Sequence, residues 1–260
     1  MIARLKTLAA AAVLAAALGI GGGAGNAVAA TGSAEIPSRD WSFDGVFGAF
    51  DRAALQRGFQ VYQEVCASCH ALSYVAYRHL DALGYNEAEI KAIAAAAEVE
   101  DGPNDEGEMF MRPGKPSDRF VSPFPNEQAA RAANGGAYPP DLALIVKARA
   151  NGANYAHALL VGYVDAPADV KIPDGMYYNA SFPGHQIAMP QPLNADGVEY
   201  GDGTPASIAQ QAEDVVTFLA WASEPEMEER KTAGVMVILF LLVFTGLLYA
   251  SKRKIWADVH

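Results

Sequence analysis

The chain has 260 residues, a length that suits one large domain or two small ones. Apolar residues make up 51% of it and charged residues only 19%, a balance that excludes a disordered polyelectrolyte. The 19 Lys and Arg against 30 Asp and Glu give a net charge of −11, which argues against nucleic acid as a partner because that partner needs a basic face.

The first thirty residues have the pattern of a secretory signal peptide. The basic residues Arg4 and Lys6 precede a long apolar run, and small residues follow at Ala27–Ala30. We therefore predict that residues 1–29 are a cleaved signal and that residues 30–229 form an exported domain. A retained N-terminal membrane anchor is the alternative.

A helix is expected to begin after Asp51, whose carboxylate can cap the first free amides. Apolar side chains then recur at the helical spacing, at Leu55, Phe59, Tyr62 and Val65. This helix would end at the first cysteine of the chain.

The only two cysteines stand in the sequence Cys66-Ala67-Ser68-Cys69-His70. A zinc site would need two further ligands, and no other cysteine or suitably spaced histidine supplies them. A thioredoxin-type redox pair would lie in a βαβ pattern, which is absent here. The third interpretation is covalent attachment of a c-type haem, in which the two thiols bond to the porphyrin vinyl groups and His70 binds the iron from below. The motif therefore predicts one covalently bound haem c and its iron.

Acidic residues are concentrated between Glu98 and Glu108, where six of eleven positions are Asp or Glu. Gly and Pro interrupt this stretch, so a regular helix is excluded, and the seven prolines of residues 101–140 predict that this region is mostly loop. Residues 31–229 hold 12 Lys and Arg against 29 Asp and Glu, a net charge of −17. The acidic stretch is either a solvated face or the docking surface of a basic partner.

The sixth ligand of the haem iron is less clearly marked. Met189 stands out because it lies in an irregular loop that Pro183, Pro190 and Pro192 stiffen. A Met/His ligand pair raises the reduction potential and suits electron transfer rather than oxygen chemistry. The other candidates are His79, His157, His185, Met109, Met111 and Met176.

Three further helices are expected in the exported domain. Residues 141–149 and 154–161 read as short helices, and a longer one begins at Thr204-Pro205 and ends before Pro225. We expect the helices after Asp51 and after Thr204 to pack together, with Gly58 allowing their close approach.

Residues 232–251 contain no charged side chain and are long enough, at about 1.5 Å per residue, to cross a hydrocarbon core. We predict a transmembrane helix at residues 230–252, followed by a cytoplasmic tail at residues 253–260. Lys252, Arg253 and Lys254 mark the cytoplasmic side. A buried helix of a soluble domain is the alternative, but the stretch lacks a polar face.

Several segments together resemble the cytochrome c1 family of the cytochrome bc1 complex, of the mitochondrial and alphaproteobacterial type. Besides the cysteine motif and the C-terminal anchor, they are Trp41–Gly45, Arg57–Tyr62, Arg112–Lys115, Ala129–Leu142 and Phe182–Gly184 with Met189. The resemblance runs from about Trp41 to Trp256.

The resemblance implies a mainly α protein with a c-type cytochrome fold, long loop insertions and one C-terminal transmembrane helix. It implies that Cys66 and Cys69 bind the haem, that His70 and Met189 are the axial ligands, and that Arg149 and Tyr155 approach the propionates. Asn134 and Pro140 fall in the haem-pocket segment. Some bacterial relatives stabilise the sixth-ligand loop with a disulfide, for which this chain has no cysteines, so the prolines and loop packing must hold Met189.

The resemblance also implies a function. The chain would pass one electron at a time from the Rieske iron–sulfur protein to a soluble cytochrome c, in a respiratory or photosynthetic chain, as the electron-transfer subunit of a quinol–cytochrome c reductase. Cytochrome b would be a further partner in a dimeric complex of the inner membrane, with the haem domain in the periplasm. The alternative is an anchored c-type cytochrome of another electron-transport complex, such as an oxidase subunit.

Overall fold

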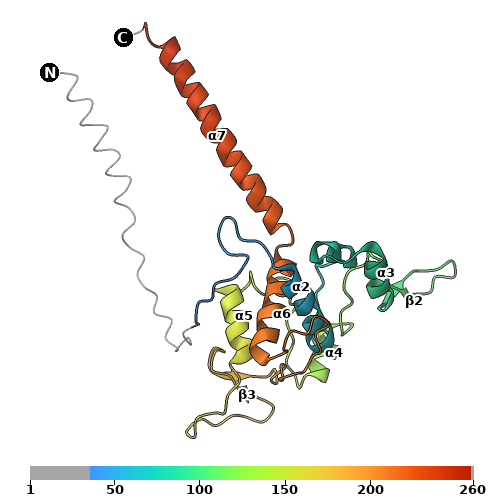
Figure 1. The fold of residues 1–260 in the computed structure, drawn as a ribbon. Helices are drawn as coiled ribbons and strands as arrows, with labels where there is room; N and C mark the ends of the chain where they lie inside the picture. Colours follow the sequence, from blue (N-terminus) through green and yellow to red (C-terminus); the bar gives the residue numbers. More distant parts are fainter. Residues whose placement is uncertain (1–35, 259–260) are drawn as a thin grey trace. The chain divides into compact units, whose positions relative to one another are not determined.

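The computed structural model describes residues 36–258, so the predicted signal peptide lies outside the described part of the chain. Helices dominate this part, and each of the two sheets has only two strands (Figure 1). The expectation of a mainly α protein is confirmed. The elements in chain order are α2 (Arg52–Val61), the π-helix η1 (Tyr62–Cys66), the 3₁₀-helix η2 (Tyr77–Leu83), α3 (Glu87–Ala95), β1 (Glu98–Asp101), β2 (Phe110–Pro113), α4 (Glu127–Ala133), α5 (Gly152–Val161), β3 (Tyr177–Tyr178), β4 (Gln186–Ile187), α6 (Ile208–Ser223) and α7 (Met227–Ile255).

Helix α2 begins where the sequence predicts. The Asp51 carboxylate accepts hydrogen bonds from the amides of Ala53 at 2.9 Å and Ala54 at 3.3 Å, which satisfies two of the free donors at the helix start. The helix then widens into η1, whose last residue is Cys66. A π-turn shifts the direction of the side chains that follow it and is often found at functional sites.

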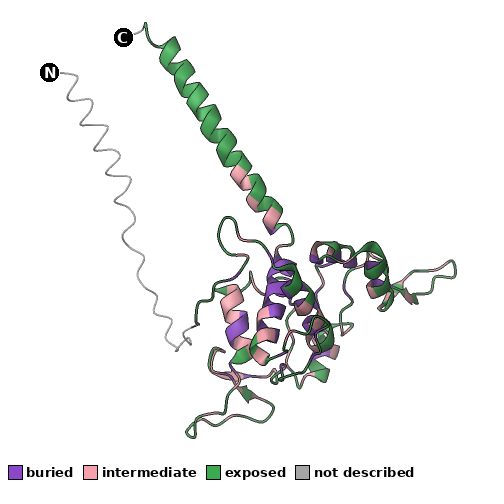
Figure 2. Ribbon diagram, viewed as in Figure 1, coloured by how far each residue is buried: buried purple, intermediate pink, exposed green. Residues whose placement is uncertain are grey.

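Helices α2 and α6 cross in close contact and carry the centre of the core. A Cβ atom added to Gly58 would lie 2.0 Å from the backbone oxygen of Asp214, so only glycine permits this approach. The aromatic rings of Phe59 and Phe218 pack here with centroids 5.6 Å apart. Most of α6 is buried, as Figure 2 shows. The predicted packing of the two helices around Gly58 is confirmed.

The start of α6 differs from the prediction by one turn. The helix is capped by Ser207, whose hydroxyl accepts from the Gln210 amide at 3.2 Å. The Thr204 amide instead donates to the Asp202 carboxylate at 2.9 Å in a preceding turn. Ser207 therefore competes successfully for the helix start, because its side chain reaches a free amide of the first turn.

The helix predicted at residues 141–149 is wrong: this segment forms successive turns. Its donors are used elsewhere, since the Leu142 amide bonds to the carbonyl of Ala71 at 2.9 Å. The Asp141 carboxylate accepts from the amide of Ser73 at 3.0 Å. These contacts with a distant segment hold the start of 141–149, and the local backbone bonds that remain, such as Ile145 to Leu142 and Lys147 to Leu144, form turns and not a continuous helix. The other short helix exists as α5, two residues longer at its start than predicted.

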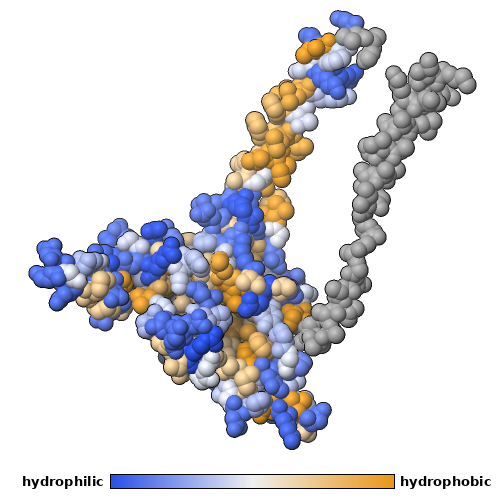
Figure 3. Space-filling model, turned by 180° about the vertical axis from the view of Figure 1, so that it is seen from behind, coloured by the Kyte–Doolittle hydropathy of each residue, from blue (hydrophilic) through white to orange (hydrophobic). Residues whose placement is uncertain are grey.

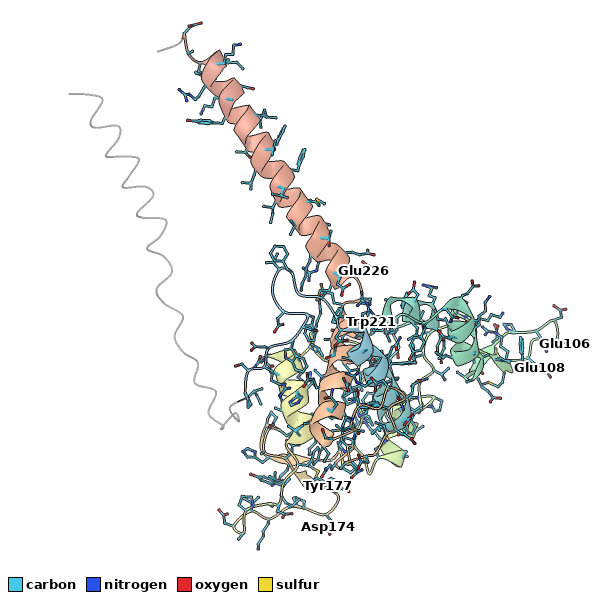
Figure 4. The ribbon with its side chains drawn as sticks, viewed as in Figure 1. Glu106, Glu108, Asp174, Tyr177, Trp221 and Glu226 are labelled. Carbon is cyan, nitrogen blue, oxygen red and sulfur yellow. The ribbon has the colours of Figure 1, made fainter. Side chains whose placement is uncertain are left out.

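Residues 101–140 are mostly loop, as predicted, but they also contain β2 and α4. Strand β2 pairs antiparallel with β1, with Glu98 opposite Pro113 and Asp101 opposite Phe110. The acidic stretch is therefore a β-hairpin whose turn holds Asp105, Glu106 and Glu108. Figure 4 shows Glu106 and Glu108 at the outer end of this hairpin.

Helix α7 is the one helix among residues 36–258 that is long and apolar enough to cross a membrane. It has 29 residues, and beyond its first two turns its side chains are almost all exposed. Figure 3 shows a hydrophobic middle section between hydrophilic ends. The exposed apolar side chains of this middle section match a lipid environment rather than water, so α7 anchors the chain in a membrane.

Candidate haem site

His70 is held from two directions. Its Nδ1 atom lies 2.8 Å from the carbonyl oxygen of Pro140, and its own carbonyl oxygen accepts a hydrogen bond from the Tyr62 hydroxyl at 3.2 Å. Because a carbonyl can only accept, Nδ1 carries the proton in this contact. The lone pair of Nε2 is then free to bind a metal, the arrangement commonly found for metal-binding histidines.

Burial also keeps the His70 ring neutral. Desolvation lowers the pKa of the imidazole below its ordinary value, although the bond to Pro140 and the charge of Asp141 oppose this effect. A neutral imidazole is the form that binds iron. The Pro140 carbonyl therefore selects the tautomer, and burial maintains the charge state that a proximal ligand needs.

The cysteine motif folds as a tight turn at the end of η1. The amides of Cys69 and His70 both donate to the carbonyl of Cys66, at 3.1 and 2.9 Å. Both thiols are free. Burial raises the pKa of the Cys66 thiol to about 12, which favours the protonated thiol over the lowered-pKa thiolate typical of redox pairs.

A second segment of the chain is hydrogen-bonded to His70 and to the residues that follow it. The chain around Pro140 meets the chain after His70 through three contacts: His70 Nδ1 to the Pro140 carbonyl, the Leu142 amide to the Ala71 carbonyl, and the Ser73 amide to the Asp141 carboxylate. The predicted pocket residue Pro140 thus acts on His70 through its backbone.

The predicted ligand Met189 is half-buried in the loop that follows β4. Its carbonyl oxygen accepts a hydrogen bond from the Tyr163 hydroxyl at 3.0 Å, which fixes the backbone at this residue. Upstream, the fully buried Asn179 organises the connection between β3 and β4, which leads into this loop. Its side-chain oxygen accepts from the amides of Ser181 at 2.9 Å and Phe182 at 3.1 Å, and its amide nitrogen donates to Leu159 at 2.8 Å. These contacts fix the loop without a disulfide.

The three alternative histidines have other structural roles. His79 Nδ1 accepts from the Ala76 amide at 3.2 Å at the start of η2. His185 contacts the Asn179 carbonyl at 3.2 Å and stacks on Tyr178. His157 is buried against the edge of Trp41.

The alternative methionines lie on loops and strands of differing exposure. Met109 and Met111 belong to the exposed hairpin, with 55% and 56% of their surfaces accessible. Met176 is half-buried just before β3.

Arg149 and Tyr155 are near each other at the start of α5. Burial raises the pKa of the Tyr155 phenol, and the neighbouring guanidinium of Arg149 opposes that rise. Arg149 itself is exposed and donates only to the adjacent Ala148 carbonyl, at 3.2 Å. Its charge is therefore available to an anionic group such as a propionate.

Asn134 ends helix α4, and its side-chain amide donates to the Ala130 carbonyl at 2.8 Å. In the described part of the chain, no hydrogen bond joins Asn134 or Met189 directly to His70. The structure thus links His70 to Pro140 and places Arg149 near Tyr155, whereas Asn134 is held by its own helix α4 and Met189 by Tyr163.

Two cavities include a residue of the cysteine motif in their walls. One of about 230 Å³ is lined by Cys69 and by the loops at residues 122–127 and 138–141. The other, of about 350 Å³, lies between Tyr62, Ala67 and α3, and its walls include none of the candidate ligands. The cysteine motif and the bonds around His70 define the candidate site, because these groups carry the chemistry of attachment and ligation.

Three residues position the site in ways that the sequence does not predict: Tyr62, Tyr163 and Asn179. The helical spacing marks Tyr62 as a core residue, and its hydroxyl contact with the His70 carbonyl spans the π-helix that begins at Tyr62. Tyr163 acts on Met189, which is 26 positions away, and the Asn179 side chain joins a local turn at Ser181 and Phe182 to the Leu159 carbonyl 20 positions away, so local spacing does not reveal either role.

The donor set around Cys66–His70 fits a haem attached through two thioethers with one imidazole ligand. With the apolar helix α7, these features define a membrane-anchored c-type cytochrome. The model of the Cytochrome C1 family matches residues 41–259. The chain therefore belongs to the cytochrome c1 family, and the resemblance seen in its sequence is confirmed. Proteins of this family carry a covalently bound haem c, which confirms the cofactor predicted from the motif.

Curated relatives cover most of the chain. Cytochrome c1-2, a mitochondrial heme protein of Solanum tuberosum, is 59% identical over 221 residues, which cover 85% of each protein. Cytochrome c1 of Rhodospirillum rubrum is 49% identical over 251 residues, covering 90% of this chain and 92% of the relative. Cytochrome b/c1 of Bradyrhizobium diazoefficiens is 53% identical over 251 residues, but the chain spans only 36% of that protein's length.

Proposed function

We propose that the chain is the haem-bearing subunit of a cytochrome bc1 complex. It takes one electron at a time from a Rieske iron–sulfur protein and passes it to a soluble cytochrome c. The observation that carries this proposal is the haem-attachment motif, with His70 fixed as a neutral ligand, in a membrane-anchored chain of the cytochrome c1 family. A relative in Candida albicans, 50% identical over 224 residues, is named as a catalytic subunit of the mitochondrial cytochrome b-c1 complex.

In this proposal Cys66 and Cys69 form the thioethers, and His70 and Met189 are the two axial ligands. When bound, the haem supplies a one-electron iron couple. Pro140 and Tyr62 hold His70 on one side, and Tyr163 holds the backbone of Met189 on the other. A thioether in the sixth position raises the potential and closes the iron to external ligands, as electron transfer requires.

Arg149 and Tyr155 are proposed to contact the propionates. An exposed guanidinium near a partly buried phenol provides a charged donor and a neutral one for a carboxylate. Asn134 is proposed to line the pocket from the end of α4.

The orientation in the membrane follows from charge. Lys252, Arg253 and Lys254 end α7, whereas Glu228 and Glu229 begin it. Basic residues remain on the cytoplasmic side, so we propose that residues 30–229 lie in the periplasm, with residues 230–252 in the inner membrane and 253–260 in the cytoplasm. Cleavage of residues 1–29 belongs to the same proposal.

The acidic hairpin is proposed to attract a basic partner, either the soluble cytochrome c or a basic hinge subunit of the complex. Arg112 neutralises its base by pairing with Asp101 and Asp118. The exposed carboxylates of Glu98, Glu100, Asp105, Glu106 and Glu108 have no ion-pair partner within residues 36–258. Unpaired surface charge of one sign speeds the association of an oppositely charged protein.

Purification of the tagged chain from native membranes under mild detergent tests the complex that the proposal names. We expect a multi-helix cytochrome b and a Rieske protein to co-purify, in a dimeric assembly that reduces cytochrome c with quinol. Co-purification with oxidase subunits instead would identify the alternative, an anchored cytochrome of an oxidase, and would overturn the proposal.

A further inference from the structure

A short loop near the start of the described chain exposes two large apolar side chains. Val46 is 62% exposed and Phe47 is 88% exposed. By contrast, the aromatic residues before and after this loop are buried: Trp41 is 8% exposed and Phe50 is 6% exposed. We refer to residues 44–49 as the 44–49 loop.

The loop has a fixed backbone. The Ala49 amide donates to the Ser42 carbonyl at 3.0 Å and closes the turn. Gly45 adopts a φ of 71°, and a Cβ atom on Gly48 would lie 2.0 Å from the carbonyl oxygen of Asp44. Two glycines thus make a tight turn with Val46 and Phe47 at its tip, so exposure of Phe47 follows from the geometry of the loop.

The base of the loop is packed into the core. The ring of Phe43 stacks on Trp41 at a centroid distance of 5.4 Å and packs against Phe50 at 5.3 Å. The tip is therefore presented from a rigid support, and covering it requires little further ordering of the chain.

Side chains of the first turns of α7 bind the 44–49 loop and the residues that flank it. The Lys231 ammonium donates to the carbonyls of Phe43 at 2.6 Å and Gly48 at 3.0 Å. The Glu228 carboxylate accepts from the amide of Phe50 at 2.7 Å and pairs with Arg52 at 2.6 Å. Figure 1 shows the segment before α2 rising beside the first turns of α7.

Lys231 is the last charged residue before the uncharged run that begins at Thr232. The loop is thus bonded to α7 at the level where the helix enters the membrane. Aromatic side chains are enriched at this depth, where the apolar region of the bilayer meets the head groups. An exposed Phe at this level has an apolar medium next to it.

We propose that the tip of the 44–49 loop, Val46 and Phe47, inserts into the lipid interface of the membrane that α7 spans. The loop is then a second membrane contact of the haem domain. Together with the ties through Lys231 and Glu228, it limits rotation of the domain about the start of α7. This inference depends on the membrane anchor and not on the electron partners.

Two labels applied to the wild-type complex in its native membrane test this inference. A phospholipid carrying a photoreactive diazirine in its upper acyl chain reports lipid contact, and brief hydroxyl-radical oxidation reports water contact. Peptide mass spectrometry assigns both labels to this chain. Tyr177 is the matched control, because it is 43% exposed and Figure 4 shows it far from Glu226 at the start of α7.

We expect lipid adducts on Val46 or Phe47 and a loss of oxidation there, whereas Tyr177 shows oxidation and no lipid adduct. In Phe47→Ser the adducts on this loop should be lost while those on α7 remain. Oxidation of Phe47 comparable to that of Tyr177 would overturn the proposal. Absence of both labels would also overturn it, because another protein subunit would then cover the loop.

Discussion

The imidazole of His70 shows how single backbone groups define a metal ligand. The carbonyl of Pro140 selects the Nδ1–H tautomer, and the Tyr62 hydroxyl holds the His70 carbonyl. Neither contact is visible in the motif itself, which identifies the ligand but not what orients it. The motif predicts the attachment chemistry because that chemistry depends on three nearby residues, whereas the orienting groups come from other segments.

Asn179 provides a test of the loop that carries Met189. In Asn179→Leu, the amides of Ser181 and Phe182 and the carbonyl of Leu159 lose their partner, at a cost of about 1–3 kcal/mol for each buried group left unsatisfied. We expect the loosened loop to let carbon monoxide bind a fraction of the reduced haem, measured by difference spectroscopy. The control is Gln186→Leu in the intervening strand β4, whose side-chain hydrogen bond is a 3.5 Å bond to the Lys171 carbonyl, and it should behave as wild type. Equal carbon monoxide binding by both variants would contradict this role of Asn179.

His157 makes the stability of the domain dependent on pH. Burial, together with the charge of Arg39, lowers the pKa of this histidine to about 4, from an ordinary value of about 6.5. The unfolded chain therefore binds this proton at higher pH than the folded chain does. The contribution of neutral His157 to the free energy of unfolding is fully present above about pH 6.5. It is lost as the pH drops towards 4, by on the order of 3 kcal/mol.

We expect His157→Leu to remove this part of the pH dependence. The thermal midpoint of the detergent-solubilised chain, followed across the same pH window, measures it. A variant whose midpoint falls as steeply as that of the wild type between these pH values would show that His157 does not contribute.

The close packing of α2 against α6 forms the centre of the haem domain. Helix α2 leads directly into η1 and Cys66, so a displacement at the crossing moves the attachment motif. The contact is further tied by the ion pair between Arg57 and the fully buried Asp214, at 2.9 Å. A buried charge of this kind is tolerated because it is paired.

Gly58→Ala tests this crossing. The added methyl would meet the backbone of Asp214, which cannot move aside as a side chain can. We therefore expect the free energy of unfolding to fall by about 1–3 kcal/mol, the range typical of an overpacked core. Gly201→Ala is the matched control, because no atom lies within 4 Å of its added Cβ. Urea unfolding followed by circular dichroism gives the comparison. Equal midpoints for the two variants would contradict the proposed close approach.

The helices that the sequence predicts well are those with a local cause. Asp51 caps α2 and apolar spacing defines α6, so both can be anticipated from neighbouring residues. Residues 141–149 have the composition of a helix, yet their polar groups bond to Ala71 and Ser73, which lie about seventy positions away. The sequence does not reveal such long-range competition. For the same reason it predicts an interruption at Glu98–Glu108 but not the pairing of β1 with β2.

At the scale of the whole molecule, charge is divided between unlike parts. The chain carries −11 overall, but residues 31–229 carry −17, and the basic end of α7 lies beyond them. The hairpin concentrates part of this negative charge on a projecting element (Figure 4). The net charge of the whole chain argues against nucleic acid as a partner. The larger negative charge of residues 31–229 taken alone indicates a basic protein as the partner.

Replacing Asp105, Glu106 and Glu108 by their amides tests this surface. We expect the rate of cytochrome c reduction by the complex to fall at low ionic strength and to depend less on salt, because screening then has less charge to act on. The control replaces three exposed acids outside the hairpin, Asp40, Glu226 and Glu229, with the same change in net charge. An unchanged salt profile in the hairpin variant, or an equal change in the control, would contradict the role of the hairpin.

The central claim is that His70 and Met189 close both axial positions of an electron-carrying haem. Exposure of the reduced protein to carbon monoxide tests it most directly, with Met189→Leu compared against Met176→Leu. We predict no spectral change in the wild type or in Met176→Leu, and carbon monoxide binding together with a strongly lowered midpoint potential in Met189→Leu. Carbon monoxide binding by the wild type, or the same phenotype in Met176→Leu instead, would contradict the account.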